Sequence, residues 1–183
     1  MITIPEFTTE NLIVSVLTPD DYELLAKYER DNRSYLSQWE PIRSAEYFSL
    51  EETQKRLKLN FQDFKLGSSI SLVGFDKSKS EIIGLCSFSN IVHGVFQACN
   101  LGYSISAKKQ GKGLMFEMLH ASIQYVFTEY NLHRIMANYI PSNTRSEKLL
   151  DRLGFKKEGL AKSYLKISGS WQDHVLTSKI NPS

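Results

Sequence analysis

A glycine- and lysine-rich segment, residues 106–113 with the sequence SAKKQGKG, has the composition of an anion-binding turn. Gly111 and Gly113 flank Lys112 directly before an apolar run with helical spacing. The first N–H groups of a helix lack backbone partners and carry partial positive charge, so an anion binds there. Glycine lets the anion approach the backbone because it has no Cβ. This glycine turn predicts a phosphate site, and a plain turn into a core helix is the alternative.

Two familiar phosphate-binding loops do not fit the glycine turn. A Walker loop requires serine or threonine directly after its lysine, whereas Gly113 follows Lys112. A dinucleotide-binding turn requires a third glycine where Phe116 stands, and a βαβ unit near the N-terminus. Neither requirement is met, so the glycine turn is either another kind of anion site or a plain turn into a core helix.

The composition is typical of one globular domain, which we expect to extend over residues 1–183. Hydrophobic residues make up 42% of the chain and charged residues 23%. No apolar run approaches the roughly 20 residues that a membrane span needs, and the first residues lack a signal-peptide pattern. We therefore expect a cytoplasmic protein without a membrane partner.

The net charge and the spacing of the cysteines and histidines argue against two further classes of function, nucleic-acid binding and metal binding. The net charge of +2 is too small for a nucleic-acid-binding surface, so no direct nucleic-acid partner is expected. Residues 101–183 nevertheless carry 12 basic against 6 acidic residues, which suits a phosphorylated ligand. Cys86, Cys99 and the four scattered histidines show no metal-ligand spacing, so no metal is expected.

Hydrophobic periodicity and capping residues predict an α/β domain of the α+β type. It consists of one mixed, mostly antiparallel sheet of seven strands flanked by about four helices. The expected strands are 11–17, 69–75, 81–92, 98–106, 133–140, 155–167 and 170–180. The expected helices are 18–30, 49–67, the segment with an apolar stripe from Met115 to Phe127, and 142–154. Residues 31–44 are expected to form an aromatic-bearing loop.

This order of elements resembles the GNAT acetyltransferases. Their acetyl-CoA loop, [QR]-x-x-G-x-[GA], lies between the fourth strand and the third helix. The matching window here is Lys108-Lys109-Gln110-Gly111-Lys112-Gly113, with lysine in the first position. The resemblance implies that the glycine turn holds the pyrophosphate of acetyl-CoA, the co-substrate, and that the lysines add positive charge.

A narrower resemblance covers essentially the whole chain and is densest over residues 98–177. The segments LGYSISAKKQGKGLMFEML, HRIMANYIPSNTRSEKLLDRLGF and EGLAKSYLKISGSWQDHVLT are similar to the RimJ-type ribosomal-protein-alanine N-acetyltransferases. This resemblance implies acetyl transfer to the α-amine of an N-terminal alanine. The implied partner is the N-terminus of a small-subunit ribosomal protein.

The same resemblance implies further cofactor-binding residues. In the GNAT fold, the strand before the glycine turn splays from its neighbour, here 133–140, and leaves backbone groups unpaired. Tyr103, Ser104 and Ile105 would offer these groups to the pantetheine amides, and a backbone N–H near Ile105 would stabilise the oxyanion. Asn143 matches a residue that holds the coenzyme chain, and a plain helix N-cap is an equal alternative.

The catalytic residues depart from related patterns. Asn100 stands where related ribosomal-protein enzymes carry a glutamate base, and Leu150 where many family members carry a tyrosine acid. Ser146, also near the coenzyme chain, is the candidate proton donor to the thiolate, against a plain surface serine. An α-amine is about one-tenth neutral at pH 7, so a water relay can replace a strong base. His174 is the other candidate base, although a structural histidine is the simpler reading.

The acceptor peptide is expected to enter between the loop near residue 39 and the last strands. The predicted substrate-binding residues are Trp39, Glu40, Asn100, Tyr164 and Asp173. Glu40 would meet the incoming ammonium or a basic side chain. Two other functions stay open: acetylation of a small amine or antibiotic, and a non-catalytic role in coenzyme A binding or ribosome assembly.

Overall fold

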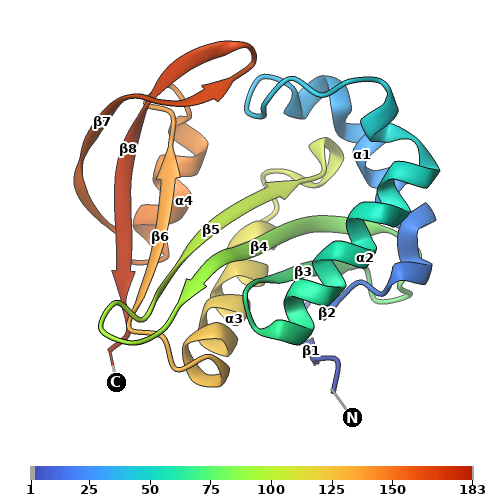
Figure 1. The fold of residues 1–183 in the computed structure, drawn as a ribbon, viewed down its shortest axis with the longest axis horizontal. Helices are drawn as coiled ribbons and strands as arrows, with labels where there is room; N and C mark the ends of the chain where they lie inside the picture. Colours follow the sequence, from blue (N-terminus) through green and yellow to red (C-terminus); the bar gives the residue numbers. More distant parts are fainter. Residues whose placement is uncertain (1–2, 183) are drawn as a thin grey trace.

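The computed structural model describes residues 3–182, which form one sheet with helices on both faces (Figure 1). The strands are β1 (Glu6–Thr8), β2 (Ile13–Val16), β3 (Ile70–Phe75), β4 (Ile82–Val92), β5 (Ala98–Ile105), β6 (Arg134–Tyr139), β7 (Lys156–Ile167) and β8 (Ser170–Ile180). The helices are α1 (Tyr22–Leu36), α2 (Leu50–Leu66), α3 (Leu114–Glu129) and α4 (Thr144–Arg152). Three 3₁₀ turns are η1 (Pro19–Asp21), η2 (Glu46–Phe48) and η3 (Ala107–Lys109).

The strand order is β1-β2-β3-β4-β5-β6-β8-β7. Every neighbouring pair is antiparallel except β5 and β6, which run parallel. The predicted mixed sheet and the four helices are confirmed. The sheet has eight strands among the described residues rather than the predicted seven. The additional strand is β1, which spans only three residues. A strand of three residues is too short to show a period of two, so the sequence pattern could not reveal it.

The first helix was predicted too short. The expected loop began at residue 31, but α1 continues to Leu36. Its buried side chains include Tyr28, Asn32 and Leu36, which are spaced four residues apart on one face. The polar Asn32 interrupts the apolar stripe, and this is why the continuation was missed.

Two apolar clusters cover opposite faces of the sheet. One contains residues of α1 and α2 together with Val73 and Phe75 of β3. The other contains the apolar face of α3 and Leu150 of α4. Figure 1 shows α2 in front of the sheet and α3 behind it. Within the described range, no helix is both long enough and apolar enough to span a bilayer.

The central feature of the sheet is the divergence of β5 from β6. Their parallel pairing covers Ala98–Asn100 with Arg134–Met136, and no later pair is formed in the described chain. Beyond Asn100, β5 stays paired with β4 as far as Ile105. Over its own length, β6 stays paired with β8 as far as Tyr139. The predicted splay is therefore confirmed, and in Figure 1 the two strands separate upward from a common lower end.

Leu150 supplies a test of how α4 is held on the sheet. It is 1% exposed, and its side chain belongs to the large apolar cluster. We expect Leu150→Ala to lower the free energy of unfolding by about 2–5 kcal/mol, because a buried leucine leaves a cavity. Urea denaturation measures the loss. The control is Leu59→Ala on the exposed face of α2, where the side chain is 60% exposed and the change should stay within about 0.5 kcal/mol. Equal losses in both variants would contradict this packing.

Candidate active site

A cavity of about 1460 Å³ opens where β5 and β6 diverge. Its walls come from the end of α1 and the following loop, β5, the glycine turn, β6 and the first turns of α3 and α4. The predicted site residues that line it are Trp39, Glu40, Tyr103, Ser104, Ile105, Lys109, Gln110, Gly111, Gly113, Asn143, Ser146 and His174. Lys108, Lys112, Asn100, Tyr164 and Asp173 are not among its lining residues. The cavity thus joins residues that are distant in the sequence.

The glycine turn presents bare backbone to this cavity. Gly111 and Gly113 have φ angles of 72° and 77°, in the left-handed region that favours glycine. A Cβ at either position would meet no atom within 4 Å, so the space beside the backbone is open. Gly113 is the N-cap of α3, and no side chain within the described residues caps this helix. Its first N–H groups are therefore available to an anion.

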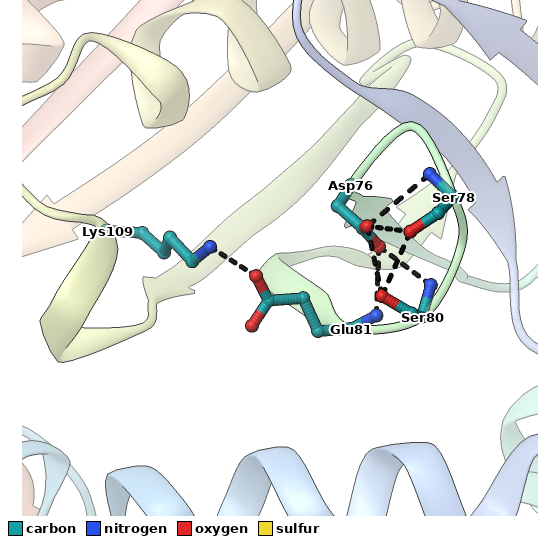
Figure 2. A network of polar contacts seen from close by, with 5 residues as sticks. All are labelled: Asp76, Ser78, Ser80, Glu81 and Lys109. Carbon is teal, nitrogen blue, oxygen red and sulfur yellow. Dashed lines mark hydrogen bonds and ion pairs between the residues drawn. The ribbon is translucent and has the colours of Figure 1, made fainter.

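The lysines of the glycine turn are not equivalent. The Lys109 ammonium is ion-paired with Glu81 in the turn between β3 and β4 (Figure 2). Asp76 organises that turn by accepting backbone hydrogen bonds from Ser80 at 2.7 Å and Glu81 at 2.9 Å. A hydrogen bond from the Ser78 hydroxyl and that from the Glu81 backbone hold the pKa of Asp76 well below its usual value. The charge of Lys109 is thus partly neutralised before any ligand binds.

Helix α1 fixes the end of β5, a role that the sequence analysis missed. The Tyr28 hydroxyl lies 3.0 Å from Ser104 Oγ. The buried Asn32 side chain accepts a hydrogen bond from the Ala107 N–H at 2.9 Å and donates one to the Tyr28 carbonyl at 2.8 Å. The buried four-residue spacing along α1 was the available signal. These contacts hold β5 and the start of the glycine turn on the α1 side.

Tyr103 and Ser146 form a hydroxyl pair across the cavity. Tyr103 Oη and Ser146 Oγ are 2.5 Å apart, although they come from β5 and α4. Burial raises the pKa of Tyr103 to about 12, so the phenol keeps its proton at neutral pH. Asn143 Oδ1 accepts a hydrogen bond from the Ser146 N–H at 3.1 Å, as an N-cap does. The sequence assigned only the backbone of Tyr103 to the site, so its side chain is an addition.

The His174 ring is held in one tautomer. Its side chain is 4% exposed, and Nδ1 lies 3.0 Å from the Gln172 carbonyl oxygen. Because a carbonyl oxygen only accepts, Nδ1 carries the hydrogen in this contact. In the neutral ring, Nε2 therefore has the free lone pair and could accept a proton.

Three predicted substrate-binding residues lie away from the cavity lining. Asn100 is in the part of β5 that still pairs with β6. Tyr164 is 43% exposed on β7. Asp173 is ion-paired with Lys162 at 2.8 Å, and the hydrogen bond from this lysine lowers the pKa of the Asp173 carboxyl. Tyr164 nevertheless contacts the His174 ring, with centroids 5.6 Å apart, so it lies beside a cavity-lining residue. Strand alternation alone could not show that Asp173 pairs with Lys162.

Another part of the cavity lining comes from the loop after α1. Trp39 and Glu40 both line it, and the Glu40 carbonyl accepts a hydrogen bond from the Ser168 N–H at 2.9 Å. This bond joins the loop to the turn between β7 and β8. Burial raises the pKa of the Glu40 carboxyl, and Arg43 opposes that shift. No group of three or more potential metal ligands is found in residues 3–182.

Comparison with known protein families identifies this architecture. The family described as "Acetyltransferase (GNAT) domain" matches residues 11–156. The chain belongs to the GNAT acetyltransferase family. The predicted family, activity class and co-substrate are thereby confirmed, since GNAT acetyltransferases take their acetyl group from acetyl-CoA. The open glycines, the uncapped start of α3 and the splayed strands fit that co-substrate.

Three relatives place the protein within the GNAT family. It is 49% identical to the [Ribosomal protein uS5]-alanine N-acetyltransferase of Escherichia coli K12, over 96% of this chain and 90% of the relative. The crystal structure of ribosomal-protein-S5-alanine acetyltransferase from Vibrio fischeri has a TM-score of 0.94 and 42% identity, over 98% of both chains. Mycobacterium smegmatis RimJ in complex with CoA-disulfide has a TM-score of 0.89, over 98% of this chain and 89% of that chain. Its 23% identity supports the fold alone.

The glycine turn makes a direct prediction about coenzyme A affinity. We expect Gly111→Val to weaken coenzyme A binding about tenfold or more, because a branched side chain then occupies the space beside the open backbone. Isothermal titration calorimetry measures the affinity. Gly94→Val is the matched control, since Gly94 has a φ of 76°, an equally open surrounding and no place in the cavity lining. Equal affinities in the two folded variants would exclude binding at the glycine turn.

Proposed function

We propose that the protein transfers the acetyl group of acetyl-CoA to the α-amine of the N-terminal alanine of a small-subunit ribosomal protein, uS5. The observation that carries this proposal is 49% identity to an enzyme named for that acceptor, over 96% of the chain. The cavity supports it, because one cavity is lined both by the glycine turn and by Trp39 and Glu40, the predicted acceptor-binding residues. A ribosomal acceptor also favours a cytoplasmic location.

The catalytic domain is proposed to include the whole chain. The family match ends at residue 156, but β8 continues the sheet beside β6 and carries His174 into the cavity lining. The last strand is therefore part of the reacting unit, although it lies beyond the family match.

Deprotonation of the acceptor amine does not require a strong base from the protein. The reacting nitrogen must be neutral, and an α-amine with a pKa of about 7.7–8.0 is partly neutral at pH 7. We assign acceptance of its proton to water or to Nε2 of His174, which lines the cavity. Glu40 is proposed to hold the arriving ammonium, since its carboxyl lines the acceptor end without an ion pair in the described chain.

The thioester of acetyl-CoA supplies the acetyl group, so a C–N bond forms while a C–S bond breaks. Backbone N–H groups of β5 beyond Asn100, which β6 does not pair, are proposed to stabilise the oxyanion. Ser146 is proposed to donate a hydrogen bond to the departing sulfur. Tyr103 Oη, 2.5 Å away, then donates to Ser146 Oγ and turns the serine hydrogen toward the cavity. The pair gives the protein a proton donor, which argues against a purely non-catalytic role.

The acceptor is tested by offering the enzyme acetyl-CoA with three substrates in separate reactions. These are a peptide starting with alanine, the same peptide blocked at its α-amine but containing lysine, and a polyamine. We expect mass spectrometry to find acetylation only on the free α-amine. The rate at low peptide concentration should rise with pH through about 8, because the neutral amine is the nucleophile. Acetylation of the polyamine alone would favour a small-amine enzyme, and no product in any reaction would favour a non-catalytic protein.

The hydroxyl pair generates a prediction about kcat. We expect Ser146→Ala to lower kcat by about 100-fold with coenzyme A affinity nearly unchanged, because the contact matters mainly as thiolate charge develops. Tyr103→Phe should lower kcat by about tenfold, since it removes only the orienting hydrogen bond. Tyr125→Phe is the control and should not change kcat, because the Tyr125 ring stacks on Phe7 and does not line the cavity. A near-wild-type kcat in Ser146→Ala would refute the role of the serine.

A further inference from the structure

An arginine–aromatic cluster occupies the acceptor end of the cavity. It consists of Arg33 at the end of α1, Arg43 in the following loop, and Tyr47 and Phe48 of η2. The two rings contact edge to face, with centroids 5.2 Å apart. Arg33 Cζ lies 4.3 Å from the centre of the Phe48 ring, and Arg43 Cζ lies 4.6 Å from the centre of the Tyr47 ring. All four residues line the cavity.

A third arginine, Arg56, lies beside the cluster, and an ion pair neutralises its charge. Arg56 also lies over the Tyr47 ring, at 3.8 Å. It donates two hydrogen bonds to the Glu29 carboxylate, at 2.8 Å and 2.6 Å, and both side chains are mostly buried. Arg56 is therefore structural, and its charge is already balanced within the protein.

Arg33 and Arg43 differ from Arg56 because neither has a carboxylate within ion-pair distance among the described residues, although Arg43 acts electrostatically on Glu40. Across residues 3–182, neither guanidinium forms an ion pair or a side-chain hydrogen bond. Stacking on a ring uses the face of a guanidinium and leaves the N–H groups at its edge free. Each arginine is thus held in place by an aromatic ring while its donors remain available. A planar carboxylate matches this pattern of donors.

The cluster lies where an acceptor polypeptide must pass. Trp39 and Glu40, the proposed acceptor-binding residues, also line the cavity and lie in the same loop as Arg43, and they define its acceptor end. A chain that delivers its α-amine to the splay between β5 and β6 continues outward along this end. Glu40 carries the opposite charge from the cluster, so the two features recognise different groups of the same ligand.

We infer that Arg33 and Arg43 form a subsite for an aspartate or glutamate side chain within the first few residues after the acetylated alanine. The inference rests on the proposed function, because it requires a polypeptide acceptor. A phosphate of nucleic acid is the less suitable occupant, since Glu40 lines the same cavity without an ion pair in the described residues and repels a polyanion more strongly than a single carboxylate. Through this subsite, the choice of acceptor depends on an acidic residue of the acceptor that is not itself acetylated.

The test uses six-residue peptides that begin with alanine and carry glutamine at positions 2 to 6, or one glutamate among those glutamines. The KM for acetylation is measured with the wild-type enzyme, with Arg33→Gln/Arg43→Gln and with Arg30→Gln. Arg30 is a matched control, because it lies on α1 but does not line the cavity. We expect one or two glutamate positions to lower KM about tenfold or more, through charge-assisted hydrogen bonds. The double variant should lose this preference, and Arg30→Gln should keep it.

Fluorescence anisotropy of each labelled peptide with the coenzyme A complex gives a second readout that needs no turnover. If no peptide is acetylated, the proposed function fails, and the anisotropy still decides whether glutamate is preferred. A preference for glutamate at no position, or one that survives in the double variant, would overturn the inference. A short single-stranded RNA that binds more tightly than every peptide, and loses this binding in the double variant, would overturn it in favour of a phosphate site.

Discussion

The site depends on a single constraint, the early end of pairing between two parallel strands. If β5 and β6 stayed paired beyond Asn100, their backbone groups would satisfy each other and the cavity between them would close. The divergence leaves backbone donors and acceptors at the centre of the domain, where a ligand can use them. It also separates the sheet into two parts. Side chains of β5 and α4 therefore contact each other across the space that opens where β5 and β6 are no longer hydrogen-bonded.

This arrangement requires β5 to be held from its other side. Antiparallel pairing with β4 continues to Ile105, and the buried Tyr28 and Asn32 of α1 bind Ser104 and Ala107. Loss of a buried hydrogen-bond partner costs about 1–3 kcal/mol, so these contacts are a substantial restraint on a short strand end. A polar residue in the apolar stripe of α1 is thus explained by the glycine turn it supports.

The two ends of the cavity carry different electrostatics, which suits a reaction between an anionic coenzyme and a cationic amine. The glycine turn has an uncapped helix start and lysines, while the acceptor end combines Glu40 with two unpaired arginines. The half-buried Tyr103 and Ser146 hydroxyls hold a proton at the splay. The charged groups thus serve recognition, and the neutral pair lies where charge develops.

The sequence by itself determined the glycine turn, the order of most elements, the splay through the family resemblance, and the positions of Asn143 and Ser146. The glycine turn and the order of elements depend on local signals, namely glycines, helix caps and hydrophobic period, which act over a few residues. The splay and the roles of Asn143 and Ser146 came from the family resemblance. Tertiary structure alone decided the Tyr103–Ser146 pair, the Asn32–Ala107 brace and the Lys109–Glu81 ion pair, whose partners are 43, 75 and 28 residues apart. It also decided that Asp173 turns away from the site to pair with Lys162. Such contacts depend on how whole elements pack, because a residue's local pattern does not specify which distant side chain it will face.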